Sequence, residues 1–226
     1  MNAIILQARQ LSKTFHRPAK VDILKQLDLT VHQGESIAIT GRSGEGKSTL
    51  LHILGTLESP SGGSLEIAGQ KVSFFNKSRI RNDKLGFIFQ SFHLMEDYTA
   101  LENVLLPARI GRRDPSPKGK AWRDACSLLE HVGLADRLHF NTKLLSGGEK
   151  QRVAIARALC NNPDIILADE PSGNLDKDTS RHIHQLLLDL ARHQGKTLII
   201  VTHDPELAAM CQTHYRLLDG QLTEEW

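Results

Sequence analysis

The segment from Gly41 to Thr49 combines residue types at the spacing that phosphate binding requires. It matches the pattern G-x-x-x-x-G-K-[ST]. Glycines let backbone N–H groups fold inward around phosphate oxygens, and the helix that follows points its positive end at the same charge. We expect Lys47 to reach the outer phosphates and the Ser48 hydroxyl to hold Mg²⁺. The predicted phosphate-binding residues are Gly41, Arg42, Ser43, Gly44, Glu45, Gly46, Lys47, Ser48 and Thr49.

The residues on either side of this loop favour phosphate binding over a chance glycine-rich turn. Residues 35–40 read as a short buried strand, and residues 50–54 continue as an apolar helix ending near Gly55. Strand, loop and helix in this order are the context that the motif requires. At average residue usage, the pattern arises by accident about once in 100 chains of this length.

Polar side chains also stand at the ends of three other buried strands: Gln90 after residues 85–89, Asp169 and Glu170 after residues 165–168, and His203 after residues 197–202. The carboxyl ends of parallel strands lie along one edge of a sheet, so all of these side chains can approach a phosphate bound by Lys47. Paired carboxylates suit metal and base chemistry, with Asp169 holding Mg²⁺ directly or through water and Glu170 polarising an attacking water. Taken alone, a polar residue at the end of a strand more often has no functional role.

A second anion site is predicted at residues 145–149, Leu-Ser-Gly-Gly-Glu. Ser146 is a candidate N-cap for a helix that runs to about Leu159, and the free N–H groups at that helix start attract negative charge. An ordinary capped helix is the alternative.

The N-terminal part is predicted to contain two antiparallel strands, residues 3–10 and 21–32, because apolar and polar residues alternate there. Residues 11–18 between them read as a loop that carries Phe15. This ring could stack on adenine or pack beneath the loop, and composition alone favours packing.

Residues 91–142 change in character and predict a helical lobe inserted between strands of the main sheet. One helix carries an apolar stripe from Leu101 to Ala108, with a kink implied at Pro107. After an exposed loop at 111–119, a second helix starts near Pro117 and stops at Gly133.

Composition gives few further constraints. The 226 residues suffice for one large domain with an inserted lobe, and a net charge of +2 gives no argument for nucleic-acid binding. No apolar run approaches the ~20 residues that cross a bilayer, and the first residues do not form a signal peptide. The three scattered cysteines favour a reducing compartment.

Together, these motifs resemble those of the ATP-binding cassette (ABC) ATPases, in their order and over essentially the whole chain. Chromosome-structuring ATPases share them but insert a long coiled coil, for which no heptad run exists here. Residues 85–90, 99–104, 151–159 and 168–176 are most similar to a subgroup that serves lipoprotein release, macrolide export and cell division.

The resemblance implies an α/β fold with a P-loop NTPase core of the ABC type and a mainly parallel sheet, an N-terminal antiparallel β-subdomain and an inserted α-helical subdomain. Within the single domain 1–226, residues 1–90 and 161–226 would form the nucleotide-binding core, and residues 91–160 the helical subdomain with its signature at 145–149.

The resemblance also implies a dimer that sandwiches ATP and Mg²⁺. ATP would lie on Lys47, Ser48 and Asp169 of one copy, with Phe15 stacked on its adenine. Glu170 would be the general base, His203 would contact the γ-phosphate, and Gln90 would sense the γ-phosphate and Mg²⁺. The other copy would close the site with Ser146, Gly147, Gly148 and Glu149.

The implied partners are membrane permease subunits docked near residues 90–103, including His93-Leu94-Met95, with no nucleic acid. The chain would hydrolyse ATP on the cytoplasmic face of the inner membrane, held peripherally by those subunits, to release lipoproteins. A macrolide- or peptide-export ATPase, a cell-division ATPase and a non-hydrolysing regulatory subunit are the alternatives.

Two segments depart from the pattern of the subgroup. Glu45 stands where a small residue is usual, and its carboxylate would repel triphosphate unless it points away, so we expect it to face solvent or the partner copy. Residues 141–144, Asn-Thr-Lys-Leu, stand where the subgroup often has Pro-x-Glu, so the resemblance supports coupling to transport less than it supports ATP binding.

Overall fold

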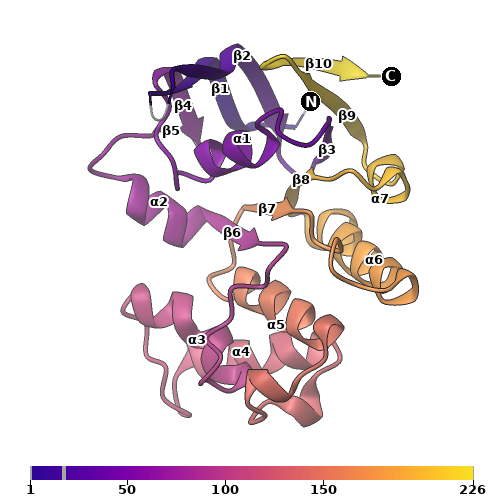
Figure 1. Cartoon of the computed structure of the whole chain (residues 1–226). Coiled ribbons are helices and arrows are strands. Elements are labelled where there is room, and N and C mark those ends of the chain that lie inside the picture. Colours follow the sequence, from indigo (N-terminus) through magenta and orange to yellow (C-terminus); the bar gives the residue numbers. More distant parts are fainter. Residues whose placement is uncertain (1, 17–18, 226) are drawn as a thin grey trace.

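The computed structural model describes residues 2–16 and 19–225 and contains two sheets (Figure 1). The larger sheet has the strand order β10-β9-β3-β8-β7-β6. Its strands span Ser36–Thr40 (β3), Leu85–Ile88 (β6), Ile165–Asp169 (β7), Thr197–Val201 (β8), Thr213–Leu218 (β9) and Gln221–Glu225 (β10). All neighbours pair in parallel except β9 and β10, which form an antiparallel hairpin at the edge.

The central strands of this sheet are apolar because both of their faces are covered. In β8, Leu198 and Ile200 point into a core shared with the helical lobe, whereas Ile199 and Val201 point into a core shared with the smaller sheet. Side chains alternate between faces along a strand, so one short apolar run joins both cores.

The smaller sheet is antiparallel and has the order β2-β1-β4-β5, with strands at Ile4–Phe15 (β1), Val21–His32 (β2), Gly62–Ile67 (β4) and Gln70–Lys71 (β5). The prediction of a loop from residue 11 is wrong, because β1 continues to Phe15. The pairing register shifts between Ala8 and Leu11, and Gln10 adopts a φ of 51°. This bulge ends the simple alternation of residue types without ending the strand. Arg17 and Pro18 of the predicted loop lie outside the described residues.

Seven α-helices are described: Lys47–Leu54 (α1), Lys77–Lys84 (α2), Ala100–Ile110 (α3), Lys120–His131 (α4), Gly147–Leu159 (α5), Lys177–Gln194 (α6) and Pro205–Ala209 (α7). Single 3₁₀ turns lie at Ala135–Arg137 and Thr142–Leu144. Helix α3 continues through Pro107 to Ile110, and α4 begins at Lys120 rather than near Pro117, with Gly119 at its N-cap. Among the helices of the described ranges, none combines the length and apolar character of a membrane crossing.

Helices α3, α4 and α5 gather in a lobe on the side of the main sheet away from the antiparallel sheet (Figure 1). The predicted fold class is therefore confirmed: a mainly parallel sheet, an N-terminal antiparallel sheet and inserted helices. The boundaries at residues 90 and 160 remain a prediction. This arrangement places the carboxyl ends of β3, β8, β7 and β6 side by side, where the predicted site residues follow the strands.

Candidate functional site

The loop after β3 folds around Lys47 as the phosphate-binding motif predicts. Lys47 is buried, and its ammonium group donates hydrogen bonds to the carbonyl oxygens of Gly41 and Arg42, each at 2.9 Å. Gly46 has a φ of 94°, and a Cβ there would lie 2.4 Å from a methyl group of Ile23. This position therefore requires glycine. No side chain caps α1, so the N–H groups at its start remain available to an anion.

Glu45 does not face outward, which corrects the expectation from sequence. Its carboxylate is partly buried and turns back onto its own loop, where Oε2 accepts a hydrogen bond from the Arg42 N–H at 2.8 Å. The same oxygen would lie 2.7 Å from a Cβ added at Gly41. The physical reason is that an exposed backbone N–H in a glycine-rich loop attracts a carboxylate three residues away.

Ser48 and Asp169 meet although they come from α1 and β7. The Ser48 hydroxyl donates a hydrogen bond of 3.2 Å to Asp169 Oδ1. Burial raises the pKa of Asp169 above its usual range, and the hydrogen bond from Ser48 opposes this shift. A nearby cation stabilises the charged form of a buried carboxylate more than that of an exposed one. The Ser48–Asp169 pair therefore fits a divalent metal ion bound beside phosphate.

Glu170 and His203 face each other across neighbouring strand ends. His203 Nδ1 lies 2.8 Å from Glu170 Oε1, while the Thr202 hydroxyl and the His203 N–H donate to Oε2 at 3.2 and 3.3 Å. Glu170 has a φ of 46°, which is uncommon for a residue with a Cβ and is maintained here by the hydrogen bond from its N–H to the carbonyl oxygen of Val201. Its carboxylate is thus held by several contacts.

Gln90 contacts the turn at residues 172–176 rather than the Ser48–Asp169 pair. Its side chain lies 3.4 Å from the Asn174 side-chain oxygen, and Asn174 donates to the Gln90 carbonyl oxygen at 3.0 Å. A Cβ on Gly173 would lie 2.9 Å from the Gln90 amide nitrogen. Among the described residues, no hydrogen bond joins Gln90 to Ser48 or Asp169, so its predicted contact with Mg²⁺ is not preformed.

Residues 145–149 form the capped helix start that the sequence predicts. The Ser146 hydroxyl accepts from the Glu149 N–H at 3.3 Å, and Glu149 accepts from the Ser146 N–H at 2.8 Å. These hydrogen bonds from Ser146, together with Arg137, hold the pKa of Glu149 below its usual value. Gly148 packs so closely on α6 that a Cβ there would lie 2.5 Å from the Thr179 methyl group.

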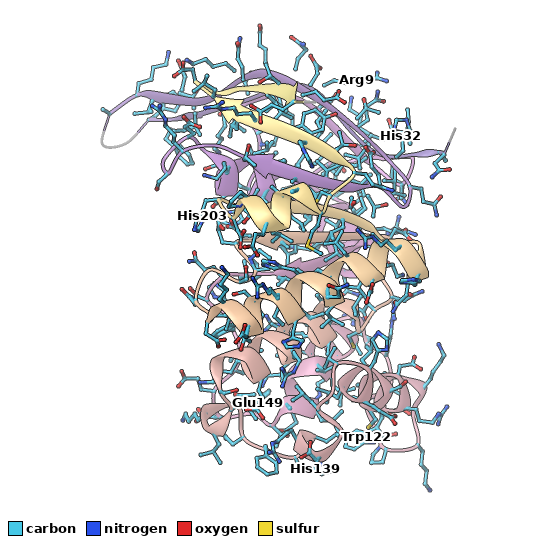
Figure 2. The ribbon with its side chains drawn as sticks, turned by 90° about the vertical axis from the view of Figure 1, so that its right-hand side faces the viewer. Arg9, His32, Trp122, His139, Glu149 and His203 are labelled. Atoms are coloured by element: carbon cyan, nitrogen blue, oxygen red, sulfur yellow. The ribbon has the colours of Figure 1, made fainter. Side chains whose placement is uncertain are left out.

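This helix start lies apart from the other site residues of the same chain. Figure 2 shows Glu149 in the lobe and His203 beside the main sheet. The structure thus brings together the loop at 41–49, Asp169, Glu170 and His203 with Gln90 at the next strand end, but not residues 146–149.

Phe15 lies at the end of β1 and is 40% exposed. The Lys13 ammonium group lies 4.9 Å from the centre of its ring and is itself anchored by Glu58 at 2.7 Å. The ring is therefore fixed on the surface and not packed beneath the loop, an arrangement that suits stacking on a flat ligand.

Two residues that tie the site together were not foreseen from the sequence. His184 of α6 is buried, with Nε2 2.8 Å from the Ser172 hydroxyl and 3.7 Å from Asp204 Oδ2, so it links the turn after Glu170 to the segment after His203. Arg157 of α5 donates to the carbonyl oxygens of Phe92 and His93 at 2.7 and 2.5 Å. Burial lowers the pKa of Arg157 to about 10. In the sequence, His184 is marked only as a polar residue among the apolar residues of the α6 segment, such as Ile183 and Leu187.

The comparisons with known proteins agree with these motifs. A family model described as ABC transporter matches residues 24–173. The lipoprotein-releasing system ATP-binding protein LolD of Protochlamydia amoebophila is 57% identical over 98% of this chain and 97% of that protein. The protein of the same name in Shewanella oneidensis is 46% identical over 98% and 97%. A solved dimeric ATP-binding cassette in a post-hydrolysis state, bound to ADP and Pi, matches with a TM-score of 0.89, 39% identity and 98% of both chains covered.

A first prediction concerns Glu45. Glu45→Ser removes one hydrogen bond to the loop and one negative charge near phosphate, two effects that oppose each other. We expect the dissociation constant for ATP to change by roughly fivefold or less, measured by nucleotide titration. Glu45→Gln, which keeps the acceptor without the charge, separates the two effects. Complete loss of turnover in Glu45→Ser would contradict this assignment.

A second prediction concerns the pH dependence of stability at His184. Burial lowers its pKa, while Asp204 and Glu206 oppose the shift. The unfolded chain binds a proton below about pH 6.5 and the folded chain only at lower pH, so the free energy of unfolding falls on acidification by at most about 1.4 kcal/mol per pH unit.

Denaturant unfolding between pH 7 and 5 tests this sign. His184→Gln should lose stability less steeply than the unaltered chain as the pH falls. His182→Gln, which changes an exposed histidine on the same helix, should follow the unaltered chain. Equal slopes for all three proteins would show that His184 is not held neutral.

Proposed function

The chain belongs to the ABC transporter family, and we propose that it is the ATP-hydrolysing subunit of a membrane complex that releases lipoproteins from the inner membrane. The observation that carries the proposal is the 57% identity to a lipoprotein-releasing ATP-binding protein over 98% of the chain. The site that the strand ends form, with Lys47, Asp169, Glu170 and His203, supports it. The chain is an ATP hydrolase of the ABC type. That its membrane complex releases lipoproteins is the more specific proposal.

ATP binding rests on the loop at 41–49 and on α1. Lys47 already occupies the position from which it can turn from the loop carbonyl oxygens to phosphate oxygens. The uncapped N–H groups of α1 add partial positive charge at the same place. Phe15, braced by Lys13, is the proposed platform for adenine.

Mg²⁺ is the cofactor that we propose beside ATP. Ser48 and Asp169 fit this ion, since Mg²⁺ is usually held by one or two protein groups together with substrate phosphates and water. When bound, the ion would neutralise charge on the phosphates. Gln90 is the third proposed ligand and would have to leave Asn174 to reach it.

Glu170 is the proposed general base. Its carboxylate would accept a proton from the water that attacks the γ-phosphorus, while Lys47 and the helix N–H groups stabilise the charge on the phosphate oxygens. His203 holds one oxygen of this carboxylate at 2.8 Å, and its side chain is otherwise well exposed. We propose that it also donates to the γ-phosphate.

A second copy of the chain is the proposed source of the remaining contacts. Ser146, Gly147, Gly148 and Glu149 stand at the start of α5, whose N-terminal N–H groups suit an anion. Within one chain, however, α5 lies in the lobe, apart from α1, which begins at Lys47 (Figure 1). In a symmetric dimer each copy can offer this helix start to the other. The dimeric state of the similar solved cassette supports this arrangement.

A groove beside Gln90 is the proposed docking site for a cytoplasmic segment of the membrane subunits. Its volume is about 570 Å³, and its lining includes Phe87, Phe89, His93, Leu106, Ile110 and Arg157. The groove overlaps the docking segment predicted from sequence. Arg157 holds the backbone of residues 92–93, so movement of this segment on docking would reach α5 and the signature at its start. Docking there would hold the chain at the cytoplasmic face of the membrane.

A third prediction tests the base. Glu170→Gln keeps the shape of the side chain but cannot accept the proton, so hydrolysis should fall by 10²-fold or more while ATP still binds. Size-exclusion chromatography with ATP should show a trapped dimer. Lys47→Ala is the contrasting variant, in which nucleotide titration should show severe loss of ATP binding and no dimer should form. Normal turnover in Glu170→Gln would refute the assignment of the base.

A fourth prediction tests the groove. Ile110 is 74% exposed at its edge, and Ile110→Asp places a charge where an apolar partner would pack. Purification of this variant from native membranes should then recover the chain without its membrane subunits. Its ATP binding should be unchanged. Leu144→Asp is the control, because Leu144 is 76% exposed outside the groove. Identification of the subunits that purify with the unaltered chain tests lipoprotein release itself.

A further inference from the structure

Two adjacent aromatic side chains project into solvent between β5 and α2. Phe74 is 79% exposed and Phe75 is 96% exposed, the highest values among the exposed large apolar residues of the described chain. Their rings meet edge to face with centres 5.8 Å apart. Single exposed apolar residues are common, but two neighbouring aromatic rings that are both exposed to solvent indicate a binding surface.

The turn that presents these rings is ordered. Asn76 closes it, since its side-chain oxygen accepts from the Ser73 N–H at 2.8 Å and its amide donates to the Lys71 carbonyl oxygen at 2.9 Å. The Lys77 N–H then donates to the Ser73 carbonyl oxygen at 3.0 Å. We call residues 73–76 the aromatic turn; in Figure 1 it belongs to the loop that projects between β5 and α2. The rings are therefore held in an exposed position and are not merely part of a frayed segment.

Positive charge surrounds the aromatic turn. Residues 70–81 contain four cations and no acidic residue. The Lys77 ammonium group lies 5.4 Å from the centre of the Phe74 ring, and Arg79 bonds to the neutral Gln70 side chain at 3.3 Å. Lys71 lies opposite Glu66 in the sheet register. In the described part of the chain, neither Lys77 nor Arg79 forms an ion pair with a carboxylate, so both charges are available to an outside anion.

We propose that the aromatic turn, with Lys77 and Arg79, binds the anionic surface of a lipid bilayer. Aromatic rings partition into the boundary between headgroups and acyl chains, and flanking cations are attracted to anionic headgroups. A projecting apolar tip with a basic surround matches a flat anionic surface better than it matches a protein pocket, which would have to enclose both rings.

The position of the turn agrees with this partner. Ser78 and Arg81 of α2, which follows the turn directly, line the groove proposed to receive the membrane subunits. A chain docked through that groove would hold α2 near the membrane, so lipid contact would add a second, weaker attachment to the docked chain. This placement rests on the proposed function, but lipid binding by the isolated chain does not.

Co-sedimentation of the full chain with permease-free vesicles tests the proposal. We expect binding to vesicles of equal parts phosphatidylcholine and phosphatidylglycerol, and little binding to phosphatidylcholine alone. Lys77→Gln and Arg79→Gln should each weaken partitioning roughly fivefold. The double variant Phe74→Ser, Phe75→Ser should weaken it roughly tenfold or more. Leu144→Ser, a change at a similarly exposed apolar residue of the lobe, should have no effect, and ATP binding should persist in every variant.

The proposal is overturned if the chain does not bind anionic vesicles. It is also overturned if binding is the same to anionic and neutral vesicles and the same for the unaltered chain and the double phenylalanine variant. Binding that needs reconstituted membrane subunits and persists in neutral lipid would assign the turn to a protein contact and also overturn it. Failure of lipid binding would leave ATP hydrolysis and recovery of membrane subunits intact, so it is distinguishable from failure of the proposed function.

Discussion

The parallel pairing of β3, β8, β7 and β6 is the constraint on which the rest of the structure depends. Each of these strands ends at the same edge, and hydrogen bonds tie the exits together: the Glu170 N–H donates to Val201, and the Thr202 N–H donates to Ile39. Because the strands are buried on both faces, a shift in register would displace apolar residues from two cores at once. The strand pairing therefore fixes the relative positions of the loop at 41–49, the paired carboxylates and His203.

Contacts between loops extend this rigid edge toward the lobe. Asn174 joins the turn after Glu170 to Gln90, and Arg157 joins the segment after Gln90 to α5, whose N-cap is Ser146. His184 closes a further link between Ser172 and Asp204. If ATP binds as proposed, a change at the loops that follow β6 and β7 can thus reach both the docking groove and the surface offered to a second copy. Each of these links consists of only one or two polar contacts, which can exchange between alternative partners.

The sequence was sufficient to predict the phosphate loop, the polar strand ends and the capped helix at Ser146, because each depends on local residue types at fixed spacing. It did not predict the extension of β1 to Phe15, since a bulge at Gln10 interrupts the alternation that marks a strand. The direction of Glu45 was predicted wrongly because repulsion from phosphate was considered without the free Arg42 N–H. The role of His184 could not be predicted because its partners, Ser172 and Asp204, are brought next to it only by the fold.

The central proposal is that residues 146–149 of one copy complete the site on Lys47 of another. Mixing two inactive variants, Lys47→Ala and Ser146→Arg, tests it directly, because a mixed dimer contains one intact site assembled from both chains. We expect ATP hydrolysis, absent from either variant alone, to return in an equal mixture to at most about one quarter of the activity of the unaltered protein. No recovery on mixing, together with full activity of Ser146→Arg alone, would contradict a site shared between two copies.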